Sequence, residues 1–241
     1  MSQEVRPWRL KEMTPIAVRE RLRARATLLV PVGTTEQHGP HLPLGCDTLL
    51  VERLADDLSA RFGIVRAPTV EYGVHASVQP LPGGAALRRK TLHRVMNELI
   101  ESWEEGADVR EFVVLTAQGS EGHLEALSTI RTESAQVTVI DVFDIDVTEF
   151  VREPEALHGG EADTSLLLYL APELVRMELA VDFVPAPSGR RHRRDAEAVA
   201  AGSPESPGHS SRASARTGER LYTFILDRIG RCLESTSTVR V

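Results

Sequence analysis

Three side chains in the first fifth of the chain are spaced so that they could bind one metal site. Glu36 and His38 are two residues apart, and Asp47 follows after a loop rich in proline and glycine. Positions i and i+2 of an extended segment point to the same side, so the carboxylate and the imidazole would converge. Mixed carboxylate and imidazole ligands suit zinc, manganese or iron, and a carboxylate can bridge two cations. The spacing therefore indicates a site for one or two divalent metal ions.

Each of the three residues also has a simpler interpretation. Glu36 could be a surface acid, His38 a packed histidine, and Asp47 the N-cap of a helix that begins at Thr48. The preceding residues favour a site, because the apolar run ATLLVPV at 26–32 is typical of a buried strand. The candidate ligands thus follow the C-terminal end of a strand, where open α/β sheets place their ligands.

The composition is that of a soluble globular protein. The chain has 241 residues, of which 41% are hydrophobic and 26% are charged, so a single domain covering residues 1–241 can bury a sizeable core. A net charge of -7 argues against a partner such as nucleic acid or an anionic membrane, because binding either would need a basic face. No apolar run approaches the ~20 residues that span a bilayer.

The N-terminal residues and the cysteines indicate a cytoplasmic protein. Residues 1–13 are charged and lack the apolar core of a secretory signal. The two cysteines, Cys46 and Cys232, are far apart and have no paired spacing, which argues against a disulfide framework or a structural zinc finger. A reducing cytoplasm is therefore the expected location.

Apolar periodicity predicts strands that alternate with helices. Helices are expected at 14–24, 48–62, 91–103, 122–134, 163–175 and 213–233, and strands at 26–32, 64–72 with a break at Pro68, 111–115 and 136–142. This alternation predicts an α/β fold with a mostly parallel sheet and helices on both faces. Residues 181–212 lack periodicity and are expected to form a long irregular excursion.

A longer string around the candidate ligands resembles a family signature. The sequence TEQHGPHLPLGCD, residues 35–47, is similar to the signature of the creatininase family of metal-dependent amidohydrolases. The match includes the neighbours of the ligands, namely Gln37, Gly39, Pro40, His41 and Pro43. The resemblance covers roughly residues 10–234 and implies the creatininase fold, one or two divalent cations, and a homo-oligomer, commonly a hexamer.

The turn after the strand at 111–115 departs from the family pattern. Relatives carry an Asn-Gly-His-Gly-Gly-Asn-like turn whose histidine binds metal, and Gln118 stands at that position. A glutamine oxygen is a neutral and weaker ligand for zinc than an imidazole. Creatininase itself also supplies a glutamate from this turn, at the position of Ser120. Glu121 and His123 lie close by in the sequence and are candidates to compensate or to contact the substrate.

The stretch HGGEADTS, residues 158–165, resembles a second family block, His-Ala-Gly-x-x-Glu-Thr-Ser. His158 matches the histidine that relatives place beside the substrate for proton transfer. Asp163 matches the acidic position and would complete the shell of a second cation, whereas Glu161 is a further candidate catalytic acid. The alternative is that Asp163 only caps a helix that begins at Thr164.

The stretch HASVQPLPGG, residues 75–84, resembles the segment that lines the substrate cleft in relatives. Ser77 fits the pattern, whereas Gln79 and Pro80 replace an acid and a histidine. Ser77 and Gln79 are the candidate substrate contacts here, and the replacements predict a different substrate. The basic run Arg190–Arg194 is interpreted as a solvated loop or a subunit contact rather than a phosphate site, because the chain is acidic overall.

The resemblance implies hydrolysis of a cyclic amide or formamide by a metal-activated water. Glu36, His38 and Asp47 would hold the cation, with Gln118 or a neighbour completing its shell, and His158 would donate a proton to the leaving nitrogen. Two alternatives stay open. The chain could catalyse a ring-opening, ring-closing or elimination step at a degenerate or single-metal site, or it could be a non-catalytic relative that has lost metal.

Overall fold

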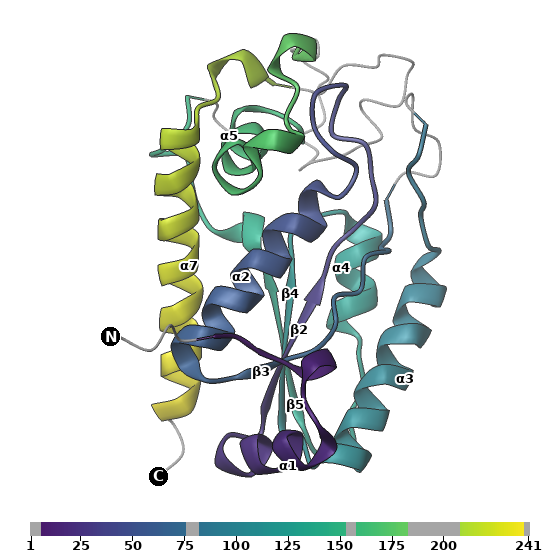
Figure 1. Cartoon of the computed structure of the whole chain (residues 1–241). Helices are drawn as coiled ribbons and strands as arrows, with labels where there is room; N and C mark the ends of the chain where they lie inside the picture. The colour runs from purple at the N-terminus through teal and green to yellow at the C-terminus, as the bar shows by residue number, and fades with distance from the viewer. Residues whose placement is uncertain (1–5, 76–81, 153–157, 183–207, 239–241) are drawn as a thin grey trace, which may run out of the picture.

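Five parallel strands form the centre of the molecule (Figure 1), and their order across the sheet is β1-β3-β2-β4-β5. The computed structural model describes residues 6–75, 82–152, 158–182 and 208–238. The strands are β1 (Trp8–Arg9), β2 (Thr27–Val32), β3 (Val65–Arg66), β4 (Glu111–Thr116) and β5 (Gln136–Asp141). β2 and β4 run side by side over their full length, with Thr27 opposite Glu111 and Val32 opposite Thr116, and β4 and β5 pair over the same length.

Helices cover both faces of this sheet. They are α1 (Pro15–Ala24), α2 (Cys46–Phe62), α3 (Arg89–Ala107), α4 (Glu121–Ser128), α5 (Glu161–Leu170) and α7 (Ala215–Thr238). Short 3-10 turns lie at Leu10–Glu12, Val142–Asp144, Pro172–Leu174, Met177–Leu179 and Ser210–Arg212. None of the helices in the described parts of the chain combines the length and apolar character that a membrane span requires.

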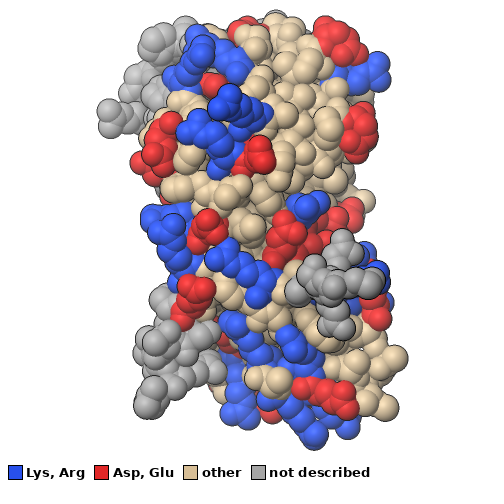
Figure 2. All heavy atoms as spheres, turned by 60° about the vertical axis from the view of Figure 1, so that its left-hand side comes forward, with Lys and Arg blue, Asp and Glu red and all other residues tan. Residues whose placement is uncertain are grey.

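Alternating side chains of β4 divide the core into two layers. Val113 and Leu115 pack with α2, α5 and α7 on one face, whereas Phe112 and Val114 pack with α1, α3 and α4 on the other. Figure 2 shows the outer side near α7, where acidic and basic side chains are interspersed. The expected α/β fold with helices on both faces is therefore confirmed, and the described strands are all parallel.

Several element boundaries match the local signals in the sequence. Thr14 caps α1, because its hydroxyl accepts a hydrogen bond of 3.3 Å from the backbone N–H of Ala17. Gly63 ends α2 in a left-handed conformation with a φ of 63°, which glycine adopts without strain. The expected strand at 64–72 is much shorter, since only Val65–Arg66 is a strand and Val70 makes a single bridge to Val32.

The helix expected at 122–134 is wrong at its C-terminal end, because α4 stops at Ser128. The reason lies on another helix. The carboxylate of Glu104 on α3 accepts hydrogen bonds from the backbone N–H groups of Glu133, Ser134 and Ala135, at 2.6–2.9 Å. This long-range contact holds residues 133–135 in a loop, and such a contact leaves no signal in the local periodicity.

The sheet has a topological switch between β2 and β4. The chain leaves β2 toward α2 on one face, and it leaves the neighbouring β4 toward α4 on the opposite face. The two loops therefore part at the C-terminal ends of these strands, the upper end in Figure 1. Open α/β sheets bind ligands in the crevice at such a point.

Candidate functional site

The loop after β2 folds back on itself and brings His38 against Asp47. The backbone N–H of Glu36 donates to the carbonyl of Leu44 at 2.9 Å, which closes the loop. Asp47 then lies in the first turn of α2, so the interpretation of Asp47 as an N-cap is wrong, because Gly45 holds that position. The Nε2 atom of His38 lies 3.2 Å from Oδ1 of Asp47. All three candidate ligands are buried.

The orientation of His38 suits metal binding. Its Nδ1 atom donates to the carbonyl oxygen of Glu36 at 3.1 Å, which directs Nε2 toward Asp47. Burial by itself would lower the pKa of His38, but the Asp47 carboxylate raises it to about 9. Asp47 is held in turn by the Thr34 hydroxyl, which donates to Oδ2 at 2.7 Å. A divalent cation at this point would take the place of the shared proton.

The turn before α5 adds an imidazole, and the first turn of α5 adds a carboxylate. His38, His158 and Asp163 each offer one ligand atom, and these three atoms lie within 4.8 Å of one another. The rings of His38 and His158 are 4.0 Å apart. Asp163 lies in the first turn of α5 rather than capping a helix at Thr164, and its Oδ2 accepts from the backbone N–H of Gly159 at 2.8 Å. The carboxylate therefore closes the turn and also faces the two histidines.

His158 is a neutral imidazole with a defined tautomer. Its Nε2 atom donates to the carbonyl oxygen of Gln37 at 2.7 Å, so the lone pair resides on Nδ1. Burial, together with the neighbouring His38, lowers the pKa of His158 to about 3. A neutral imidazole of this kind can bind a cation or accept a proton.

Gln118, which follows β4, contacts Glu36. The side-chain N–H of Gln118 donates to Oε2 of Glu36, and its carbonyl oxygen accepts from the backbone N–H of Ser120 at 3.0 Å. Both residues are buried. The other oxygen of Glu36, Oε1, lies 3.6 Å from Nε2 of His158. Gln118 thus reaches the site through its amide nitrogen, not through the oxygen expected to bind metal.

Four further residues were predicted to belong to the site, and none of them is among the groups described above. Glu161 is buried in the first turn of α5, where its carboxylate accepts from the backbone N–H of Arg152 at 2.8 Å. Glu121 begins α4 and is exposed. Ser77 and Gln79, like the basic run 190–194, lie outside the described residues. The roles predicted for Glu161 and Glu121 stay predictions.

His123 is fully buried behind Thr116, and hydrogen bonds occupy both of its ring nitrogens. Nδ1 accepts from the backbone N–H of Val74 at 3.1 Å, so the proton is on Nε2, which lies 3.0 Å from the Thr116 hydroxyl oxygen. Burial lowers the pKa of His123 to about 4. These contacts favour a structural role over the substrate contact expected from the sequence, which stays a prediction.

His123 should make the folded chain sensitive to acid. Its pKa is about 4 when folded and 6.5 as an ordinary histidine. Below pH 6.5 the unfolded chain therefore binds a proton that the folded chain excludes, so stability falls as the pH falls. Between pH 7.5 and 5, His123 should account for a loss of roughly 2 kcal/mol in the free energy of unfolding.

Urea unfolding at the two pH values measures this loss. His123→Gln is the suitable variant, because a glutamine can also accept from Val74 and donate to Thr116 without titrating. The variant should lose roughly 2 kcal/mol less stability than the wild type between pH 7.5 and 5. An equal loss in both proteins would show that His123 is not the group that titrates.

Sequence reasoning assigned no site role to His41, which is buried beside the histidine pair. Its Nε2 atom lies 2.9 Å from the hydroxyl oxygen of Thr164 on α5. That hydroxyl donates to the carbonyl of Gly159 at 3.3 Å, so the imidazole is the donor to Thr164. His41 therefore ties the loop after β2 to α5. The position of His41 in the string TEQHGPHLPLGCD was the sequence signal that could have indicated a place at the site.

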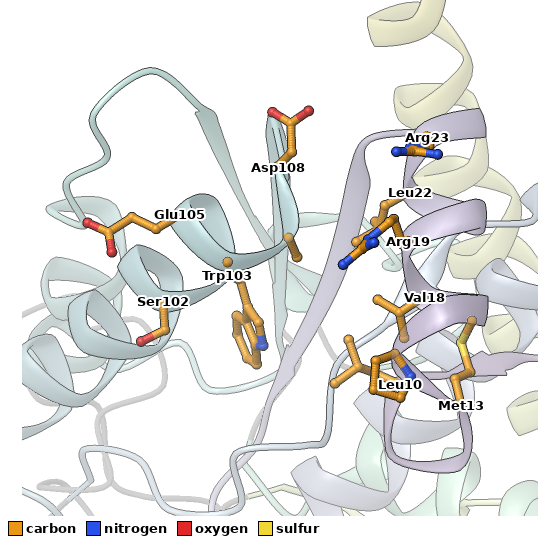
Figure 3. A pocket seen from close by; sticks show the side chains of 13 residues that line it. Leu10, Met13, Val18, Arg19, Leu22, Arg23, Ser102, Trp103, Glu105 and Asp108 are labelled. Carbon is orange, nitrogen blue, oxygen red and sulfur yellow. The ribbon is translucent and has the colours of Figure 1, made fainter.

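A groove of about 590 Å³ lies apart from these residues, between α1 and the end of α3 (Figure 3). Trp103 and Leu22 contribute apolar surface, Arg19 and Arg23 lie on the α1 side, and Asp108 lies just before β4. These positions place the groove near the N-terminal ends of β2 and β4, opposite the candidate ligands. The groove is therefore not part of the candidate metal site.

Comparison with protein families and relatives gives a consistent result. The sequence model of the creatininase family, described as creatinine amidohydrolase, matches residues 11–233. A 3-dehydro-scyllo-inosose hydrolase of Thermotoga maritima is 30% identical over 186 residues, which are 72% of this chain and 59% of that protein. A mycofactocin precursor peptide peptidase of Mycolicibacterium smegmatis is 31% identical over 219 residues, which are 85% of this chain and 84% of that protein. The chain thus spans less than two thirds of the Thermotoga relative.

Solved structures agree in fold. A crystal structure of creatinine amidohydrolase (creatininase) superimposes with a TM-score of 0.77 and 25% identity, over 95% of this chain and 98% of that one. Two further creatininase structures are described as a manganese form and a mutant of Zn-Zn type, with TM-scores of 0.79 and 0.78. The metals named there belong to those proteins.

Proposed function

This chain belongs to the creatininase family, and from that premise we propose that it is a metal-dependent amidohydrolase. The proposed reaction is hydrolysis of a C–N bond in a small cyclic amide or formamide. The observation that carries the proposal is the buried convergence of His38, His158 and Asp163 within 4.8 Å, beside Asp47. The relatives' names give an inosose derivative, a precursor peptide and creatinine as substrates, and a small cyclic amide or formamide is the class proposed for this chain.

The donor set fits a divalent cation. Imidazole nitrogens and carboxylate oxygens are the ligands that zinc and manganese take in proteins. Nδ1 of His38 donates to a backbone carbonyl, which leaves the lone pair of His38 on Nε2. Nε2 of His158 donates to another backbone carbonyl, which leaves the lone pair of His158 on Nδ1. Backbone carbonyls that orient ligating imidazoles in this way are a common feature of metal sites. His38, Asp47 and Asp163 are the proposed ligands, with His158 beside them.

The chemistry then follows from the neighbouring side chains. A cation held there would polarise the substrate carbonyl and bring the pKa of a water near neutrality. His158 has a pKa of about 3 and is neutral, so it must accept a proton before it can donate one. The proposed order is therefore proton uptake from water at Nδ1, followed by donation to the leaving nitrogen. Burial of His158 and Glu36 keeps bulk water away from this transfer.

Chelation and reconstitution test the proposal. The purified chain would be stripped with a chelator, reloaded with zinc, manganese or iron(II), and incubated with a panel of cyclic amides, formamides and short peptides. We expect hydrolysis of one amide class that disappears on chelation and returns with at least one metal. Hydrolysis that survives complete removal of metal would contradict the proposal, as would a metal-loaded chain that cleaves none of the panel.

A further inference from the structure

We propose that this site holds one divalent cation rather than two, because the amide of Gln118 closes the Glu36 end of the site with hydrogen bonds. The inference rests on the proposed metal-dependent function and refines it. Its starting point is the orientation of one side-chain amide. Gln118 contacts the Glu36 carboxylate, so the orientation of its amide decides which group faces Glu36.

The orientation of the amide is fixed from both sides. The carbonyl oxygen of Gln118 accepts from the backbone N–H of Ser120 at 3.0 Å, and the amide N–H donates to Oε2 of Glu36. A 180° flip would place the amide hydrogens against the N–H of Ser120 and the carbonyl oxygen against a carboxylate. Two attractive contacts would become two repulsive ones, so only the observed orientation is stable.

The turn that carries Gln118 is held in place as well. Its backbone N–H donates to the Thr116 hydroxyl at 3.2 Å, and Thr116 is in contact with His123. The hydroxyl of Ser120 donates to the carbonyl of Val74 at 2.7 Å. Gln118 is 6% exposed, so water cannot replace a lost partner easily. The amide therefore stays directed at Glu36.

An amide nitrogen cannot serve as a ligand in this position. It carries hydrogens with partial positive charge and has no available lone pair, so it repels a cation. The Gln118 amide donates a hydrogen bond to the Glu36 carboxylate and so offsets part of its negative charge. A second cation would otherwise offset that charge. Glu36 becomes a hydrogen-bonded wall of the site rather than half of a second metal shell.

The α5 side of the site retains enough donors for one ion. His38 and Asp163 offer atoms within 4.8 Å of each other, and Asp47 lies 3.2 Å from His38. Three or four protein ligands complete the shell of a zinc ion, with or without a water. The described donors therefore add up to one cation at the α5 side of the site.

Metal counting on the full chain tests this inference. Chelated protein would be reloaded with excess Zn²⁺, passed through a desalting column and measured by elemental analysis. We expect close to one equivalent for the wild type and close to none for His38→Gln. Gln118→Glu keeps the shape of the side chain but sets two carboxylates face to face, so it should raise the content toward two equivalents, as should Gln118→His.

The possible outcomes separate the two proposals. Two equivalents in the wild type would overturn the single-cation inference and leave the metal-dependent function standing. Less than a tenth of an equivalent would overturn both. Manganese-loaded protein gives an independent reading by electron paramagnetic resonance, because two ions ~3.5–4 Å apart couple magnetically and a single ion does not. An uncoupled spectrum is expected for the wild type, and a coupled spectrum would contradict the inference without any variant that has to fold.

Discussion

His38→Gln should remove nearly all retained metal and lower hydrolysis at least about a thousandfold, because a bound cation contributes several kcal/mol to transition-state stabilisation. His38 is central because it lies against Asp47 and also within reach of His158 and Asp163. Metal content by elemental analysis and initial rates on the substrate identified by the amide panel measure the two effects.

The matched control is His93→Gln, which makes the same chemical change on α3. His93 contacts the carbonyl of Ala126 at 3.3 Å and is only partly buried, away from the candidate ligands. This control should keep wild-type metal content and rate. A His38→Gln protein that is folded and still holds a full equivalent of metal would remove His38 from the ligand set.

Gly218→Ala should lower the free energy of unfolding by about 3 kcal/mol, at the upper end of what overpacking usually costs. Gly218 lies in α7 where this helix passes closest to α5. A Cβ atom there would overlap the backbone carbonyl oxygen of Ser165 and lie 2.9 Å from Cβ of Tyr169. The two helices would have to separate, and α5 carries Glu161 and Asp163. Urea unfolding measures the change in stability.

Gly106→Ala is the matched control, because Gly106 is also helical, in α3, and a Cβ atom there meets nothing within 4 Å. Alanine is the better helix former, so this change should be neutral or stabilise the protein by up to ~1 kcal/mol. Equal effects of the two substitutions would show that the close approach of α5 and α7 is not rigid. The metal content of Gly218→Ala would show whether the displacement of α5 from α7 reaches the candidate metal site.

The parts of the fold that depend on neighbouring residues were predictable. Apolar periodicity places α2 and β4 correctly, and the capping residues Thr14 and Gly63 place helix ends. The end of α4 was not predictable, because Glu104 holds the following loop from another helix. The two-residue strand β1 was missed for a similar reason, since a pairing with β3 defines it and its own sequence is too short to show periodicity.

In the candidate site, too, features that depend on neighbouring residues were predictable and features that depend on distant residues were not. The i, i+2 spacing of Glu36 and His38 is a local feature, and the structure places His38 against Asp47, whereas the convergence of the Glu36 carboxylate with them stays a prediction. The direction of the Gln118 amide depends on Glu36, which is 82 positions away in the chain. No local pattern could distinguish an amide that presents its oxygen from one that presents its nitrogen.

The chain leaves β2 and β4 toward opposite faces of the sheet, and α5 completes the candidate site. This arrangement has a consequence for biosynthesis. The early loop supplies His38 and the following helix α2 supplies Asp47, but His158 and Asp163 leave the ribosome more than a hundred residues later. At the proposed metal site, a nascent chain would hold a cation only weakly until α5 has docked. Tight metal loading should therefore be a late event, after translation has passed this helix and it has packed against the sheet.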